Sequence, residues 1–152
     1  MRAMSKSVPR LVLDTNVALD LFVFRDAACE RLRAALAQGV VIAVVDESCR
    51  EEWQAVLGYP QFGLSEAARE QAMAAFDQAV SLLPAAAMVP RPEVKLPRCA
   101  DPDDQKFLEL ALASGAQCLL SKDKALLQLA RRTAREGWFQ ILCPSAWEPP
   151  VR

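Results

Sequence analysis

Four acidic residues stand at positions from which they could share a metal ion. Asp14 ends a short apolar run, Asp123 follows another, and Asp104 lies in the first turn of a helix that Pro102 opens. The fourth is Glu52. In open parallel sheets, sites form at the carboxyl ends of strands, where we expect these acids to meet. Acids gathered there repel one another unless a cation neutralises them, and all-oxygen ligands are typical of Mg²⁺ or Mn²⁺.

Helical periodicity separates the acids that can face inward from those that cannot. Asp104 begins the apolar stripe of its helix, so its carboxylate is expected to point inward, while Lys106 falls on the opposite side. A carboxylate on a buried face is costly unless something positive or hydrogen-bonding meets it. In the helix expected over residues 46–57, Glu52 lies at the edge of the apolar stripe and Glu51 points away. Glu52 is therefore the better candidate of the two.

Each acid also has an ordinary structural explanation. Asp14 could start a turn after a strand, and Asp123 could cap the helix that follows it. Asp101 and Asp103 are candidates for capping the helix at Pro102. Only the expected convergence of the acids at one edge of a sheet favours a metal site over these separate roles.

The composition excludes several kinds of chemistry. The chain has no histidine, which removes a Ser-His-Asp triad, the usual zinc ligand and the commonest general base. Its five cysteines are widely spaced without a C-x-x-C motif, which favours core packing in a reducing compartment over disulfides or zinc. The net charge of −1 disfavours a general duplex-binding protein. No signal peptide and no apolar run of about 18 residues are visible, which predicts a cytoplasmic protein without membrane contact.

Apolar runs alternate with amphipathic segments along the chain. Strands are expected at residues 10–14, 40–45, 117–120 and 139–142, with a weak strand within 85–100. Helices are expected after a cap at Thr15 and Asn16, and at residues 26–38, 46–57, 65–83, 101–115 and 124–135. Because the strands are continuously apolar and alternate with helices, the pattern predicts an α/β fold with a parallel sheet covered on both faces. The length of 152 residues is that of one domain.

Four sequence blocks, in order, resemble the PIN-domain family. They are L-D-T-N-V at 13–17, E-W-Q-A-V-L-G-Y-P-Q-F at 52–62, D-P-D-D-Q-K-F-L-E-L-A at 101–111 and S-K-D-K-A-L-L at 121–127. The closing I-L-C-P at 141–144 fits as well. Within the family, the blocks are similar to bacterial VapC-like proteins described as toxins of toxin–antitoxin pairs. The resemblance covers residues 10–147, which are expected to form the PIN domain, with a flexible leader at 1–9 and a tail at 148–152.

This resemblance implies both a fold and an activity. The fold is a three-layer α/β/α sandwich with a parallel central sheet in the order 3-2-1-4-5. The activity is that of a Mg²⁺- or Mn²⁺-dependent endoribonuclease, which cuts single-stranded RNA by a metal-activated water and leaves 5′-phosphate and 3′-hydroxyl ends. The implied partners are single-stranded RNA and a cognate antitoxin, and a homodimer is compatible with the family. The implied catalytic metal ligands are Asp14, Glu52, Asp104 and Asp123, and the implied helpers are Asn16, Ser121 and Asp101.

Two other functions stay open at the level of sequence. One is a catalytically silent PIN-like module that binds a protein partner, although the presence of all four acids weighs against it. The other is an aspartyl phosphatase or receiver-type domain, in which the aspartate after the first strand accepts a phosphoryl group. Phosphatases of that class usually show Asp-x-Asp at this point, whereas this chain has Asp14-Thr15-Asn16.

Overall fold

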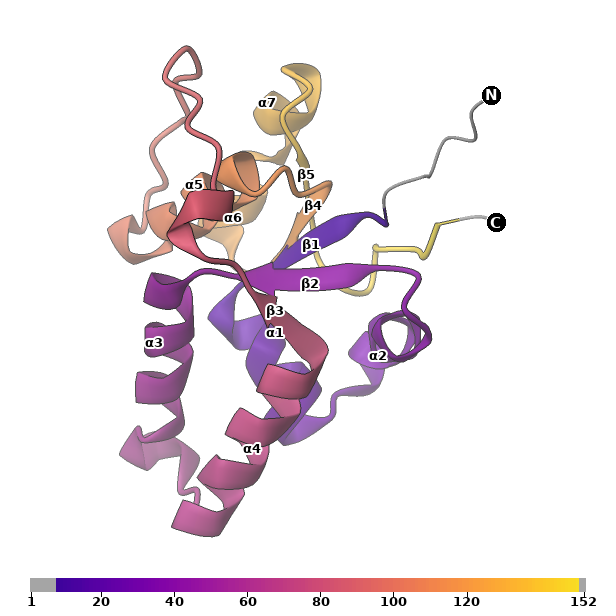
Figure 1. Ribbon diagram of the computed structural model, residues 1–152, viewed down its shortest axis with the longest axis vertical. Helices are drawn as coiled ribbons and strands as arrows, with labels where there is room; N and C mark the ends of the chain where they lie inside the picture. The colour runs from indigo at the N-terminus through magenta and orange to yellow at the C-terminus, as the bar shows by residue number, and fades with distance from the viewer. Residues whose placement is uncertain (1–7, 151–152) are drawn as a thin grey trace.

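Five short strands form the central sheet of the computed structural model, which describes residues 8–150 (Figure 1). They are β1 (Arg10–Leu13), β2 (Ile42–Val45), β3 (Val80–Leu82), β4 (Cys118–Leu120) and β5 (Gln140–Leu142). Neighbouring strands are all parallel, and their spatial order is β3-β2-β1-β4-β5. The predicted α/β fold with strand order 3-2-1-4-5 is therefore confirmed. Residues 1–7 of the expected leader and residues 151–152 of the expected tail lie outside the described residues, and both segments stay predictions.

Helices cover both faces of this sheet. They are α1 (Thr15–Leu19), α2 (Glu30–Gln38), α3 (Glu47–Leu57), α4 (Glu66–Ala79), α5 (Gln105–Ala113), α6 (Lys124–Leu127) and α7 (Ala130–Arg135). Figure 1 shows α1 to α4 below the sheet and α5 and α7 above it. The chain thus changes face between β3 and β4, which makes the carboxyl ends of β1 and β4 the switch point of the sheet. No helix in the described range is long and apolar enough to cross a membrane.

The central strands are buried except at the first residue of β1. Their pairing register decides which residues follow them at the carboxyl edge of the sheet. Leu11 and Val12 of β1 and Leu119 and Leu120 of β4 have no exposed surface, which explains why these runs are continuously apolar. Leu13 pairs with Leu120. The residues directly after both strands, at positions 14 and 121, consequently emerge side by side at the same edge of the sheet.

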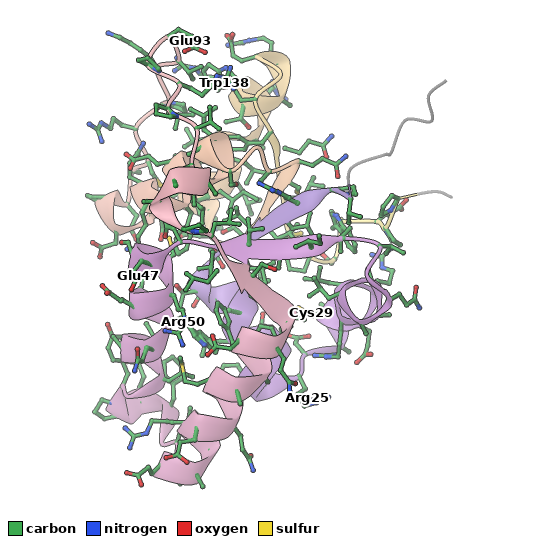
Figure 2. All side chains as sticks on the ribbon, viewed as in Figure 1. Arg25, Cys29, Glu47, Arg50, Glu93 and Trp138 are labelled. Carbon is green, nitrogen blue, oxygen red and sulfur yellow. The ribbon has the colours of Figure 1, made fainter. Side chains whose placement is uncertain are left out.

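An aromatic cluster fixes the pair formed by α3 and α4. Trp53 of α3 stacks on Phe76 of α4 with ring centroids 5.2 Å apart, and Phe22 packs edge-on against both rings. At the surface, Arg50 of α3 (Figure 2) forms an ion pair of 2.7 Å with Asp77 of α4. Since Trp53 directly follows Glu52, its burial also sets the rotation of α3 about its axis and the direction in which Glu52 points.

Three predicted elements are wrong in detail. The helix predicted over residues 65–83 ends at Ala79, and residues 80–82 instead form β3, because Val80 pairs with Ala43 of β2. No strand forms within 85–100, which contains a short 3₁₀ turn at 85–87 and otherwise loop. The helix predicted over 124–135 is interrupted between α6 and α7. At Val80, pairing with β2 outweighs the local preference for helix. The sequence of residues 65–83 alone cannot show this pairing.

Truncation of Trp53 tests how much the aromatic cluster contributes to stability. Trp53 is 2% exposed, and removing a large buried aromatic side chain leaves a cavity that typically costs about 3–5 kcal/mol. We expect Trp53→Ala to lower the free energy of unfolding by this amount in urea denaturation. Gln54→Ala, a change at the exposed neighbouring position, should stay within about 0.5 kcal/mol of wild type. Similar values for the two variants would contradict the assigned role of the cluster.

Candidate metal centre

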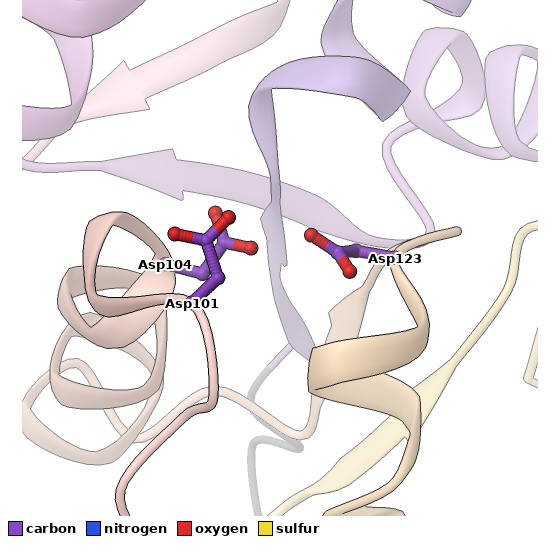
Figure 3. A group of neighbouring side chains, drawn as sticks. All are labelled: Asp101, Asp104 and Asp123. Carbon is purple, nitrogen blue, oxygen red and sulfur yellow. The ribbon is translucent and has the colours of Figure 1, made fainter.

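Three aspartates from two segments bring their carboxylates together near the carboxyl end of β4. One oxygen from each of Asp101, Asp104 and Asp123 lies within 4.8 Å of the other two. Figure 3 shows Asp123 pointing toward Asp101 and Asp104 from the opposite segment. Asp101 is exposed, and the other two are half-buried. We call these residues the aspartate trio.

Two members of the trio are held in place by capping the turns that follow them. Asp101 Oδ1 accepts a hydrogen bond of 3.0 Å from the Asp103 backbone N–H. Asp123 Oδ1 accepts one of 2.9 Å from the Ala125 backbone N–H. The structural explanation for these acids is thus correct, but it does not exclude a ligand role. Each cap engages one oxygen of a carboxylate that also offers an oxygen to the trio.

Asp104 is the least satisfied member of the trio. Its Oδ2 is buried and has no hydrogen-bond partner among the described residues, and its side chain does not cap α5. Burial, followed by the hydrogen bond with Asp123 and the charges of the neighbouring acids, raises the pKa of Asp104 to about 8. The same hydrogen bond lowers the pKa of Asp123. The metal-free pair therefore shares a proton near neutral pH, in the place where a cation would satisfy both groups.

Asp14 lies beside the trio, and each of its oxygens accepts a hydrogen bond. It is 3% exposed; its Oδ1 accepts from the Val17 backbone N–H at 2.9 Å, and its Oδ2 accepts from the Ser121 hydroxyl. Burial raises the pKa of Asp14 to about 6, although these hydrogen bonds oppose the shift. The Ser121 oxygen also accepts from the Asp123 backbone N–H at 2.9 Å. Ser121 is completely buried, so it links Asp14 to the segment that carries Asp123.

Glu52 is near the trio but outside it. One of its oxygens forms an ion pair with Lys106, and the other accepts a hydrogen bond from the Thr15 hydroxyl. Glu51 is exposed, as the helical wheel predicts. Lys106 was expected to face away from the acids, and this expectation is wrong. The flexible Lys106 side chain reaches across the first turn of α5. A helical wheel describes only one helix, so it could not show that Glu52 of α3 lies close to this turn.

The remaining predicted helper, Asn16, is exposed on α1. The helix cap predicted at Thr15 and Asn16 lies one residue earlier, because Asp14 itself accepts from the Val17 N–H. Sequence reasoning missed two polar contacts of the site, those that Thr15 and Lys106 make with Glu52. The only signal for them was their closeness in sequence to Asp14 and Asp104.

The donor set of the trio fits a hard divalent cation. All three members offer carboxylate oxygens, and one buried oxygen of Asp104 lacks a partner. Mg²⁺ and Mn²⁺ prefer such oxygen ligands, whereas zinc sites usually include histidine or cysteine. The five cysteines are free, and Cys29, Cys49, Cys99 and Cys118 are buried. The trio could therefore hold Mg²⁺ or Mn²⁺.

Comparison with known proteins agrees with this geometry. A family model described as PIN domain matches residues 10–125, a range that contains the trio, Asp14 and Glu52. PIN domains are typically metal-dependent nucleases. No curated protein matches the chain. β5 lies beyond the matched range but belongs to the same sheet.

The raised pKa of Asp104 predicts how the metal-free protein responds to pH. An acid whose pKa is higher in the folded state than in the unfolded state stabilises the fold while protonated. That contribution is complete below the unfolded pKa, near 3.8, and is lost as the pH rises through about 8. Asparagine does not ionise, so Asp104→Asn should be more stable than wild type at pH 8–9, and the difference should shrink toward pH 4.

Thermal melts of both proteins in chelator, across this pH range, measure the difference. Asp103→Asn changes an exposed neighbour with the same charge and serves as the control, for which no such pH-dependent gain is expected. An Asp104→Asn variant that melts below wild type at pH 8–9 would show that the ionised carboxylate supports the fold.

Proposed function

Because the chain belongs to the PIN-domain family, we propose that it is a Mg²⁺- or Mn²⁺-dependent endoribonuclease that cuts single-stranded RNA. The observation that carries the proposal is the aspartate trio, with its buried and unpartnered Asp104 oxygen. The fold brings carboxylates that repel one another together at the switch point of the sheet. Capping explains the positions of Asp101 and Asp123 but not the buried, unpartnered oxygen of Asp104.

Different residues of the site would bind the ion and hold its ligands in position. Asp101, Asp104 and Asp123 would hold it, since one oxygen from each converges, and Asp14 and Glu52 beside them are the further ligands that the sequence resemblance implies. Ser121 keeps Asp14 and the Asp123 segment in fixed relation through two hydrogen bonds. When bound, a divalent ion supplies Lewis acidity, which activates water and stabilises negative charge at phosphorus. Because the chain has no histidine, carboxylates are the groups available to take up a proton from the attacking water.

Single-stranded RNA suits the surface around the trio. Asp101 is exposed, so an extended strand can approach the trio from solvent. The preceding loop carries the exposed cations Lys95 and Arg98. Gln105 of α5 anchors the end of this loop through hydrogen bonds with the Cys99 N–H at 2.7 Å and the Pro97 carbonyl at 3.2 Å. We assign Lys95 and Arg98 to contacts with RNA phosphates, which position a strand without reading its sequence.

The biological role that we propose is that of the toxin in a toxin–antitoxin pair, acting in the cytoplasm and inhibited by a cognate antitoxin. The support is the order and spacing of the four sequence blocks, which resemble those of VapC-like proteins. A gene for a short DNA-binding protein next to this one would agree with the role. Growth arrest on induced expression, absent for Asp104→Asn, would test it directly.

The rival functions have less support in the structure. A phosphoryl-accepting aspartate must offer an oxygen to its substrate, whereas both oxygens of Asp14 accept hydrogen bonds and the residue is 3% exposed. A silent protein-binding module would not need to keep a buried carboxylate oxygen without a partner. Metal-binding calorimetry of wild type and Asp14→Ala separates the enzyme from a silent module.

The nuclease proposal is tested by removing the metal. Cleavage of a labelled single-stranded RNA should require Mg²⁺ or Mn²⁺, disappear in excess chelator and return when the ion is added back. Asp104→Asn, purified in parallel, should be inactive and serves as the control for contaminating nucleases. Undiminished cleavage by wild type in chelator, together with an inactive variant, would contradict the metal mechanism.

The neighbours Glu51 and Glu52 provide a matched pair of variants. Glu52→Gln removes the charge that contacts Lys106 and Thr15, and we expect it to weaken metal binding and lower activity at least about a hundredfold. Glu51→Gln changes an exposed side chain. It should leave activity near wild type and shift stability by less than about 0.5 kcal/mol. Loss of activity in the Glu51 variant instead would contradict the placement of this acid.

A further inference from the structure

An ion pair joins the segment that carries Asp123 to the far end of the helix that Asp14 begins. Lys122, the residue directly before Asp123, forms this pair with Asp20. Asp14 precedes α1, and Asp20 follows it as the first residue of a π-helix (Asp20–Phe24). The pair therefore connects two segments that both carry acids of the site.

Burial makes this pairing necessary for Asp20. The Asp20 side chain is 10% exposed, whereas that of Lys122 is 46% exposed. Lys122 is the only ion-pair partner of Asp20 within residues 8–150. A buried carboxylate that loses its partner is left as an uncompensated charge, which is strongly unfavourable. The need to neutralise Asp20 therefore holds the exposed Lys122, and the backbone that carries it, in one place.

The chain after β4 is attached to α1 at two points. At the beginning of α1, Ser121 donates a hydrogen bond to Asp14, and at its end Lys122 pairs with Asp20. A segment that is held at one point can still rotate about it, whereas two points fix its orientation. Asp123 directly follows both attachments, and one of its oxygens belongs to the trio. The direction of that oxygen therefore depends on the ion pair as well as on Ser121.

The charge of Lys122 by itself works against metal binding. Burial raises the pKa of Asp14 to about 6, and the hydrogen bonds to its oxygens oppose this shift. Of the two charges that also act on Asp14, that of Asp123 raises the pKa and that of Lys122 lowers it. The ammonium is thus close enough to the site to repel a cation there, and its removal alone would strengthen metal binding. A positioning role predicts the opposite sign.

We infer that Asp20 and Lys122 are positioning residues for the metal ion: their ion pair fixes residues 121–123 so that the Asp123 carboxylate is held at the trio. Both residues act through the backbone next to Asp123. Loss of a group that orients metal ligands typically costs about 10–100-fold in metal affinity. The inference rests on the proposed function only for the binding of a divalent ion at the trio, and it does not depend on RNA cleavage.

Calorimetric titration of the full chain with Mn²⁺ tests this role. Lys122→Met should raise the Kd for Mn²⁺ at least about tenfold, although it removes a positive charge, and Asp20→Asn should do the same. Because either change breaks the same pair, the double variant should bind Mn²⁺ about as weakly as each single variant. Lys122→Arg keeps a cation opposite Asp20 and should bind close to wild type.

The double variant also covers a failure to fold. Lys122→Met leaves the buried Asp20 charge without a partner, whereas the double variant leaves no such charge and should fold when the single variant does not. Circular dichroism before each titration shows which variants are folded.

Lys124 provides the control for a general effect of charge. It directly follows Asp123, is exposed, and forms no ion pair in the described part of the chain. Lys124→Met therefore makes the same change in charge next to the trio but leaves the Asp20 pair intact. Its Kd for Mn²⁺ should be equal to that of wild type or slightly lower.

Each outcome decides between the alternatives. Wild-type or tighter Mn²⁺ binding by Lys122→Met, or by the double variant where the single one does not fold, would overturn the inference. Additive losses in the double variant, or an equal loss in Lys124→Met, would overturn it as well. If wild type binds no Mn²⁺, the proposed metal site is wrong and the inference fails with it. The expected changes in Kd without any RNA cleavage would support the inference and refute the nuclease proposal.

Discussion

Repulsion between carboxylates at the switch point of the sheet is the constraint around which this structure is organised. Asp101, Asp104 and Asp123 come within a few ångströms of one another, and Asp14 lies beside them. Without a cation, the protein meets the repulsion by keeping a proton on the Asp104 and Asp123 pair, which is why the pKa of Asp104 rises and that of Asp123 falls. A site of this kind stores electrostatic energy that a divalent ion releases on binding.

The fold supplies this arrangement with few residues. The register of β1 and β4 aligns positions 14 and 121 at one edge, and Ser121 then connects Asp14 to the Asp123 segment. Capping then fixes the orientation of three of the acids, because Asp14, Asp101 and Asp123 each accept a backbone hydrogen bond on one oxygen. The same side chains that begin helices thus also build the site. A structural role and a ligand role are complementary here, since a carboxylate has two oxygens.

Much of this could be predicted from the sequence, for identifiable reasons. The continuously apolar strands and the four blocks predicted the parallel sheet and its order, and the helical wheel separated Glu51 from Glu52. Asp104 was expected to turn inward on the same grounds. β3 was misplaced because Val80 becomes a strand only by pairing with β2. The Lys106 contact was missed because it joins α5 to α3, and helical periodicity describes one helix at a time.

The central claim is that the trio binds a divalent ion, and anomalous diffraction from a crystal grown with Mn²⁺ tests it most directly. The account predicts an anomalous peak among the carboxylates of Asp101, Asp104 and Asp123, about 2.0–2.3 Å from one oxygen of each, as is usual for small divalent cations. A peak elsewhere in the molecule, or none at saturating Mn²⁺ with the trio in its present geometry, would contradict the account.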